Sequence, residues 1–95
     1  SWGTFISADA TPNVANYKYW QTNTGGLTIT DFDGGILGDI KYIKSKGAIV
    51  YDVTSSGLKG GSTNLTTADG DLTCWLYGGT DWLLISFTDQ SDNLS

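Results

Sequence analysis

Two apolar runs separated by a glycine-containing loop constrain the fold of this chain more than any other feature. Leu72–Tyr77 and Trp82–Phe87 each have the length of a β-strand, and Gly78 and Gly79 lie in the loop between them. Glycine adopts the positive φ angles that tight reversals require. The stretch from Leu72 to Phe87 therefore predicts a β-hairpin.

Both faces of this hairpin are apolar, although an antiparallel sheet in water normally has one polar face. Because side chains alternate along a strand, Trp75 and Tyr77 share one side of the first strand, and Trp82 and Leu84 share one side of the second. Either a second layer of the same chain or another chain must cover the aromatic face. Since a chain this short has little sequence left for a second layer, we expect an oligomer whose interface contains these four residues.

In the remainder of the chain, short apolar runs alternate with turn-forming residues, as is typical of an all-β protein. Its 95 residues include 13 glycines and one proline, and short runs rich in Val, Ile, Tyr and Trp alternate with Gly, Ser, Thr, Asn and Asp. We predict a small antiparallel β-sandwich or compact barrel of about six or seven strands. Residues 1–16 are predicted to be a linker or first-strand region, residues 17–88 the β-domain and residues 89–95 a C-terminal tail.

Two inner segments show alternation that predicts which side chains face the core. In the run from Asp39 to Lys44, Ile40 and Tyr42 are expected to point inward and Lys41 outward. In the run from Ala48 to Val53, the alternate positions Ile49, Tyr51 and Val53 are all apolar and are expected to share a buried face. Cys74 lies within the first hairpin strand, where a buried inert thiol is the commonest role.

The charge balance excludes several classes of partner. Ten aspartates face five lysines, with no glutamate or arginine, which gives a formal net charge of −5. Binding to nucleic acid requires clustered cations, and the same negative charge disfavours anionic membranes. No apolar run approaches the length of about 18 residues that a membrane-spanning helix needs. We therefore expect neither a nucleic-acid nor a membrane partner.

Catalytic chemistry has little support in this sequence. Without histidine the chain has no Ser–His or Cys–His pair, so we expect no enzyme activity and no cofactor. Asp31 with Asp33, or Asp69 with Asp71, could form a pair of catalytic carboxylates or bind a hard cation such as calcium. However, aspartate beside glycine more commonly caps backbone N–H groups in turns.

Short motifs follow one another along the chain in a characteristic order: Gln21–Thr24, Thr28–Gly35, Gly38–Ile40, Leu58–Lys59, Asn64–Thr67, Gly70–Thr73 and Gly79–Trp82. This order, over roughly residues 12 to 88, resembles a small β-domain that recurs at the C-terminal end of bacteriophage tailspike and tail-fibre proteins, commonly after a pectate-lyase-like β-helix. Such domains act as terminal caps and oligomer-forming modules, usually in trimers. The resemblance thus implies a passive, structural role in a virion, or otherwise outside the cell.

Three functions remain open from the sequence. The first is a homotrimeric module of a tail fibre or tailspike that caps and presents the distal tip for host attachment. The second is recognition of a host-surface polysaccharide through exposed aromatic side chains, for which Tyr17, Tyr19 and Trp20 are the predicted residues. The third is a subunit of an extracellular β-rich filament, formed when a contact between chains does not close.

Overall fold

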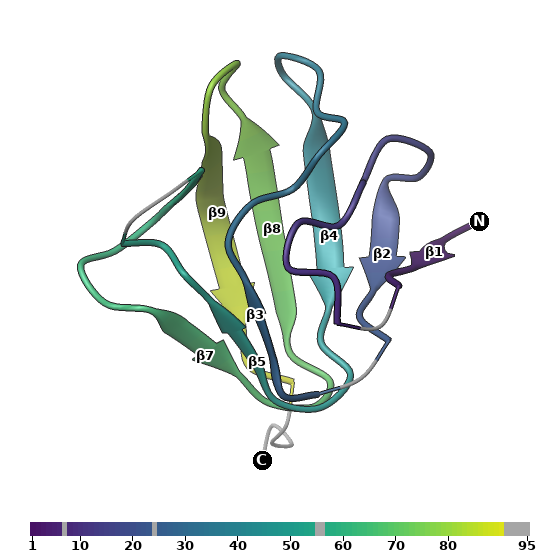
Figure 1. Ribbon diagram of the computed structural model, residues 1–95, viewed down its shortest axis with the longest axis vertical. Helices are drawn as coiled ribbons and strands as arrows, with labels where there is room; N and C mark the ends of the chain where they lie inside the picture. The colour runs from purple at the N-terminus through teal and green to yellow at the C-terminus, as the bar shows by residue number, and fades with distance from the viewer. Residues whose placement is uncertain (7, 24, 55–56, 91–95) are drawn as a thin grey trace.

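The chain folds into two β-sheets that lie against each other as two layers (Figure 1). The computed structural model describes residues 1–6, 8–23, 25–54 and 57–90, and these residues form nine strands and no helix. The strands are β1 (Gly3–Thr4), β2 (Tyr19–Gln21), β3 (Leu27–Ile29), β4 (Ile40–Lys44), β5 (Ile49–Tyr51), β6 (Leu58–Lys59), β7 (Leu65–Thr67), β8 (Leu72–Tyr77) and β9 (Trp82–Thr88). The all-β prediction is confirmed.

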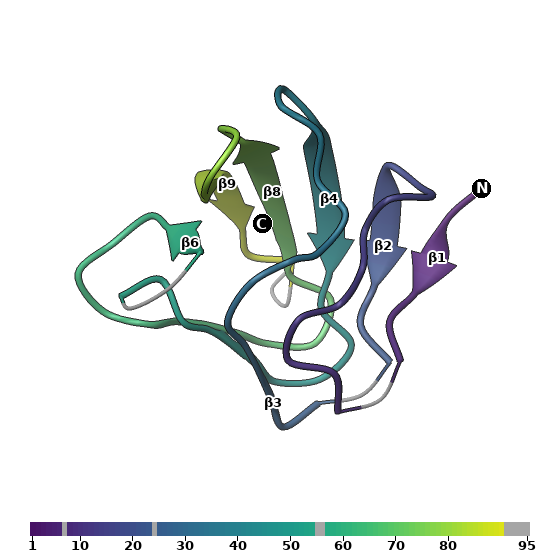
Figure 2. The same ribbon diagram turned by 45° about the horizontal axis from the view of Figure 1, so that its top comes forward.

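The chain alternates between the two sheets over most of its length. The larger sheet has the strand order β1-β2-β4-β8-β9-β6 and the smaller sheet the order β3-β5-β7. From β2 to β8 each strand lies in the sheet opposite to that of the strand before it. Figure 2 shows the strands of the larger sheet side by side, from β6 on the left to β1 on the right. As a result β2 pairs with β4, and β3 with β5, in parallel, while β4–β8, β5–β7 and β8–β9 are antiparallel. Both sheets are therefore mixed rather than purely antiparallel.

The predicted hairpin is formed by β8 and β9. These strands pair antiparallel, and in the loop between them the N–H of Gly78 donates a 2.8 Å hydrogen bond to the carbonyl of Asp81. A β-bulge interrupts the register, so that Trp75 lies opposite Leu84 whereas Cys74 lies opposite Ser86. Because of the extra residue, Leu84 and Ser86 lie on opposite faces of β9, although they are two positions apart in the chain.

The core between the sheets is built around Phe32. This side chain is 3% exposed, and its ring centroid lies 5.6 Å from that of Trp75 and 5.5 Å from that of Trp82. Tyr51 packs on Trp75 from the smaller sheet, with ring centroids 5.3 Å apart. The predicted inward face of the segment around β5 is confirmed, since Ile49, Tyr51 and Val53 are all buried. These contacts hold the two layers together.

The orientation of β4 is the reverse of the prediction. Lys41 and Ile43 face the core, with exposed fractions of 6% and 0%, whereas Ile40 and Tyr42 point to the outside. The Lys41 ammonium donates a 2.7 Å hydrogen bond to the carbonyl of Tyr17, which gives the buried charge a polar partner. A lysine can occupy an inner position in this way because its long apolar stem packs while its end reaches a polar group.

The first residues of the chain are part of this fold. β1 pairs in parallel with β2, and both Phe5 and Val14 belong to the core cluster. The N–H of Val14 also donates a 2.9 Å hydrogen bond to the carbonyl of Asp33. β1, Phe5 and Val14 are therefore integrated with the rest of the β-fold. β9 ends at Thr88, and residues 91–95 of the predicted tail lie outside the described residues.

Candidate functional site

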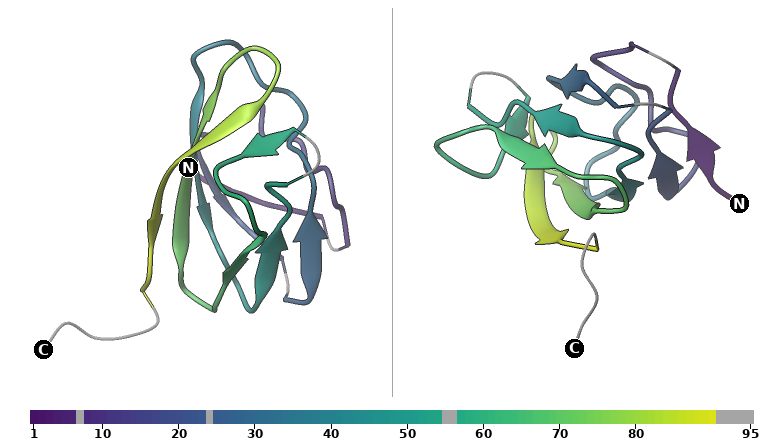
Figure 3. Two further views of the ribbon diagram at one scale, coloured as in Figure 1. Left: turned by 90° about the vertical axis from the view of Figure 1, so that its left-hand side faces the viewer. Right: turned by 90° about the horizontal axis from the view of Figure 1, so that it is seen from below.

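The four residues predicted for an oligomer interface face the interior of the single chain. Trp75 and Trp82 have no exposed surface, and Tyr77 and Leu84 are partly buried against the core cluster. Figure 3 (left) shows the smaller sheet lying over this side of the β8–β9 hairpin. The second layer comes from the same chain, so Trp75 and Trp82 offer no surface to a partner, and this part of the prediction is corrected.

The opposite face of the six-stranded sheet is exposed and largely apolar. We use the name outer face for the side chains of this sheet that point away from the three-stranded sheet. Its members from β2, β4, β8 and β9 include Tyr19, Gln21, Ile40, Tyr42, Lys44, Leu72, Cys74, Leu76 and Leu83. Residues opposite one another in register share a face, so Ile40, Leu76 and Leu83 form a row across three strands.

Several apolar side chains of the outer face are in contact with solvent. Tyr19 is 50% exposed, Ile40 36% and Leu83 41%. The rings of Tyr19 and Tyr42 stack with their centroids 5.1 Å apart, which continues the apolar surface from β2 to β4. An exposed patch of this kind is typical of a surface that contacts a partner or ligand.

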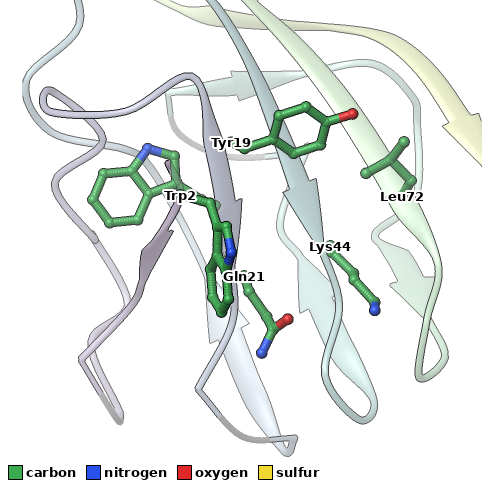
Figure 4. A pocket seen from close by; sticks show the side chains of 6 residues that line it. Trp2, Tyr19, Gln21, Lys44 and Leu72 are labelled. Atoms are coloured by element: carbon green, nitrogen blue, oxygen red, sulfur yellow. The ribbon is translucent and has the colours of Figure 1, made fainter.

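A pocket of about 320 Å³ lies on the outer face near its β1 edge. It is lined by Trp2, Tyr19, Trp20, Gln21, Lys44 and Leu72. Figure 4 shows Tyr19 and Gln21 on β2, Lys44 on β4 and Leu72 on β8, with Trp2 from the segment before β1 completing the wall. The pocket combines exposed aromatic rings with one amide and one ammonium group.

Two of the three residues predicted to bind glycan, Tyr19 and Trp20, line the pocket. Trp20 is 8% exposed, and its indole Nε1 donates a 2.9 Å hydrogen bond to the carbonyl of Tyr17. The Tyr17 ring packs edge-on against Trp20, with ring centroids 5.4 Å apart, but Tyr17 does not line the pocket. Tyr19 points to the outer face, where it stacks on Tyr42 and shares the pocket with Trp2. The structure thus joins Tyr19 and Trp20 to Trp2, which the sequence analysis did not identify as a binding residue.

Sequence reasoning missed Trp2, Gln21 and Lys44 as pocket residues. The alternation of Tyr19 and Gln21 on β2 was a usable signal, because residues two apart share a face of a strand. Trp2 and Lys44 approach them only through the parallel pairings of β1 with β2 and of β2 with β4, and no local pattern encodes those pairings.

The four candidate metal-binding aspartates lie in the connections between the named strands. Asp31 accepts a 2.8 Å hydrogen bond from the N–H of the next residue, Asp69 accepts a backbone N–H over 2.9 Å, and Asp71 accepts two, over 2.8 and 3.0 Å. Asp33 is exposed. Within the described residues, no group of three or more His, Cys, Asp or Glu side chains could hold a metal ion. Asp31, Asp69 and Asp71 thus have the turn-capping contacts that are the commoner role of such aspartates.

Two buried groups have raised pKa values. Burial raises the pKa of Tyr51 to about 12, and the nearby hydroxyls of Thr73 and Ser45 lower it only in part. The Tyr51 hydroxyl has no partner at hydrogen-bonding geometry among the described residues. Burial also raises the pKa of the Cys74 thiol, with partial opposition from the Tyr42 hydroxyl. Both shifts favour the neutral forms, which suits structural rather than reactive roles.

Comparisons with known proteins add no family to this description. No protein-family model and no curated protein matches the chain. The described residues include no helix with the length and apolar character needed to cross a bilayer.

Proposed function

We propose that this chain is a structural module of a bacteriophage tailspike or tail fibre that forms a homotrimer and presents the distal tip for host attachment. The observation that carries the proposal is one part of the exposed outer face, the apolar row of Ile40, Leu76 and Leu83, which includes none of the pocket residues. The order of sequence motifs favours the tail-fibre setting, which corresponds to a location in the virion or otherwise outside the cell. The proposal moves the predicted interface from the aromatic face of the hairpin to the face behind it.

Burial of this face would supply free energy that a small domain needs. Burying one large apolar side chain contributes about 1.5–3 kcal/mol, and a symmetric assembly repeats each contact in every chain. A domain of this size buries only about 60–65% of the surface of its unfolded chain, so its stability alone is marginal. Association therefore adds a substantial fraction of the total stability.

The charge distribution is compatible with contact between identical acidic chains. None of the nine strands contains an aspartate, whereas Lys41, Lys44 and Lys59 lie in strands of the larger sheet. The negative charge is thus confined to loops and turns in the described part of the chain. Copies that approach through the outer face do not bring carboxylates of the strands together, which limits repulsion.

Light scattering across a range of concentrations tests the proposal. We expect a trimer mass for the unchanged protein and a shift to monomer for Leu83→Asp, which places a charge at the β9 end of the apolar row. Thr66→Asp is the matched control, because it adds the same charge at an exposed strand position of the smaller sheet. Circular dichroism establishes that both variants remain folded. A monomer mass for the unchanged protein at every concentration would contradict the proposal, and particles that elongate with concentration would favour the filament subunit.

Glycan recognition is a second candidate function, and the pocket beside Trp2 is the observation that favours it. Trp2 is 58% exposed and Tyr19 50% exposed, and both line the same pocket. Exposed aromatic rings are the usual platform for the apolar face of a sugar. A titration with host-surface polysaccharide, followed by tryptophan fluorescence, tests this function independently of the oligomeric state.

A further inference from the structure

We propose that the pocket formed by Trp2, Tyr19, Gln21 and Lys44 binds an acidic saccharide, a sugar unit whose carboxylate contacts the Lys44 ammonium. The inference rests on the second candidate function and specifies its ligand class. The pocket volume of about 320 Å³ lies at the lower end of the range for small-molecule sites, which suits a short saccharide segment.

The pocket presents exposed aromatic surface to a ligand. Tyr19 stacks on Tyr42 with an interplanar angle of 22°, which supports the Tyr19 ring on the sheet surface. Trp2 lies across the pocket and leaves more than half of its surface in solvent. A sugar ring can therefore pack its C–H groups against these rings without first displacing a core side chain.

The polar part of the pocket has unused hydrogen-bonding capacity. Among the described residues, neither the Gln21 amide nor the Lys44 ammonium has a side-chain hydrogen bond or ion pair. The amide supplies a donor and an acceptor for sugar hydroxyls, and the ammonium supplies donors and a positive charge. These groups lie on adjacent strands, because Gln21 and Lys44 are register partners in the parallel β2–β4 pair.

The charge of the pocket selects an acidic ligand over a neutral one. The protein has a formal net charge of −5, but the exposed Lys44 ammonium gives the pocket a positive charge. The acidic residue next to the pocket in sequence, Asp71, forms no ion pair with Lys44 among the described residues. Both Asp71 carboxylate oxygens accept backbone hydrogen bonds, from Ala68 and from Gln90. A ligand carboxylate is therefore the natural partner of Lys44.

The test uses oligosaccharides of galacturonate, glucuronate and mannuronate, together with their methyl esters, which remove the charge at nearly unchanged shape. Binding is followed by tryptophan fluorescence and calorimetry at low salt, on the protein in whichever oligomeric state light scattering finds. We expect at least one acid to bind and to bind more tightly than its ester. Lys44→Gln should weaken acid binding by about two- to fivefold and leave ester binding unchanged, as expected for an exposed ion pair.

Two further variants make the result specific to the pocket. Trp2→Ala should weaken binding of both acid and ester by about tenfold, because it removes the stacking surface. Lys59→Gln is the matched control, since it removes a lysine from β6 at the far edge of the same sheet and should leave binding unchanged. Absence of binding to all three acids overturns the inference. Equal binding of acid and ester overturns the acidic ligand but preserves glycan recognition, and binding by a monomer preserves the inference while overturning the trimer.

Discussion

The indole Nε1 of Trp82 donates a 3.0 Å hydrogen bond to the backbone carbonyl of Phe32, fifty residues earlier in the chain. Trp82 begins β9 of the larger sheet, and Phe32 lies in the connection between β3 of the smaller sheet and β4 of the larger. Both side chains are buried, and their rings meet edge to face with an interplanar angle of 89°. This pair therefore fastens the hairpin to the connection that crosses between the layers.

Trp82→Phe should lower the free energy of unfolding by about 2–4 kcal/mol. The change leaves a cavity and removes the only indole donor of the Phe32 carbonyl among the described residues. Urea denaturation measures the loss. Trp2→Phe is the matched control at an exposed site and should change the stability by no more than about 0.5 kcal/mol. Equal losses of stability for the two substitutions would contradict the inference that Trp82 is central to the core.

Gly35→Ala should destabilise the protein because the Gly35 backbone packs closely against the rings of Trp82 and Tyr77. A Cβ atom at this position would lie 2.6 Å from Cζ2 of Trp82 and 2.9 Å from the ring of Tyr77. We expect a cost of about 1–3 kcal/mol as the rings shift. At Gly61 the nearest atom would lie 3.5 Å away, so Gly61→Ala should be tolerated. Thermal melting compares the two variants, and a Gly35→Ala variant as stable as Gly61→Ala would contradict the close packing.

Tyr51→Phe should preserve or increase stability, by up to about 1 kcal/mol, because the buried Tyr51 hydroxyl lacks a hydrogen-bond partner among the described residues. The same substitution should alter the response to alkaline pH. In the folded protein the pKa of Tyr51 is raised from 10.0 to about 12, so between these values the unfolded chain releases a proton that the folded chain retains. Stability therefore falls as pH rises through this interval, by at most about 3 kcal/mol.

Urea denaturation at pH 9 and pH 11 measures this pH effect. The difference in stability between Tyr51→Phe and the unchanged protein should grow with pH, since the two proteins differ only at this side chain. A difference that is the same at the two pH values would show that Tyr51 ionises equally in the folded and unfolded chains.

Cys74 should react slowly with a disulfide reagent in the folded protein. Its side chain is 6% exposed, and burial raises the pKa of the thiol, so little reactive thiolate is present near neutral pH. We expect the rate to increase by about tenfold or more when urea unfolds the chain. Absorbance of the released thiol follows the reaction, with Cys74→Ser as the blank. A folded-state rate equal to that of the unfolded chain would indicate an accessible thiol.

The sequence analysis succeeded where local pattern decides the structure. The β8–β9 hairpin follows from two apolar runs and a glycine-containing loop, and the buried face of Ile49, Tyr51 and Val53 follows from alternation. The same rule failed at β4, because alternation separates two faces without identifying the inner one. Lys41 takes the inner position there because the carbonyl of Tyr17, distant in sequence, accepts its ammonium.

The candidate site was harder to predict because its residues meet through non-local pairing. The bulge in β9 places Phe87 opposite Thr73, while Leu83 lies opposite Leu76 on the other face. No residue pattern in the sequence predicts this bulge. Simple alternation therefore gives the wrong cross-strand partners for the last residues of β9. The pocket likewise joins four separate segments of the chain, of which the sequence analysis identified only Tyr19 and Trp20 as binding residues.

The alternation of the chain between the two sheets has a consequence for the order in which the molecule assembles. Parallel neighbours such as β2 and β4 are separated in the chain by a strand of the opposite layer, so most pairings join distant segments. The β8–β9 hairpin is the one antiparallel pairing of consecutive strands among the described residues. Because this pairing is local, we expect it to form early in folding, and we expect the many distant pairings to make the remaining steps slow.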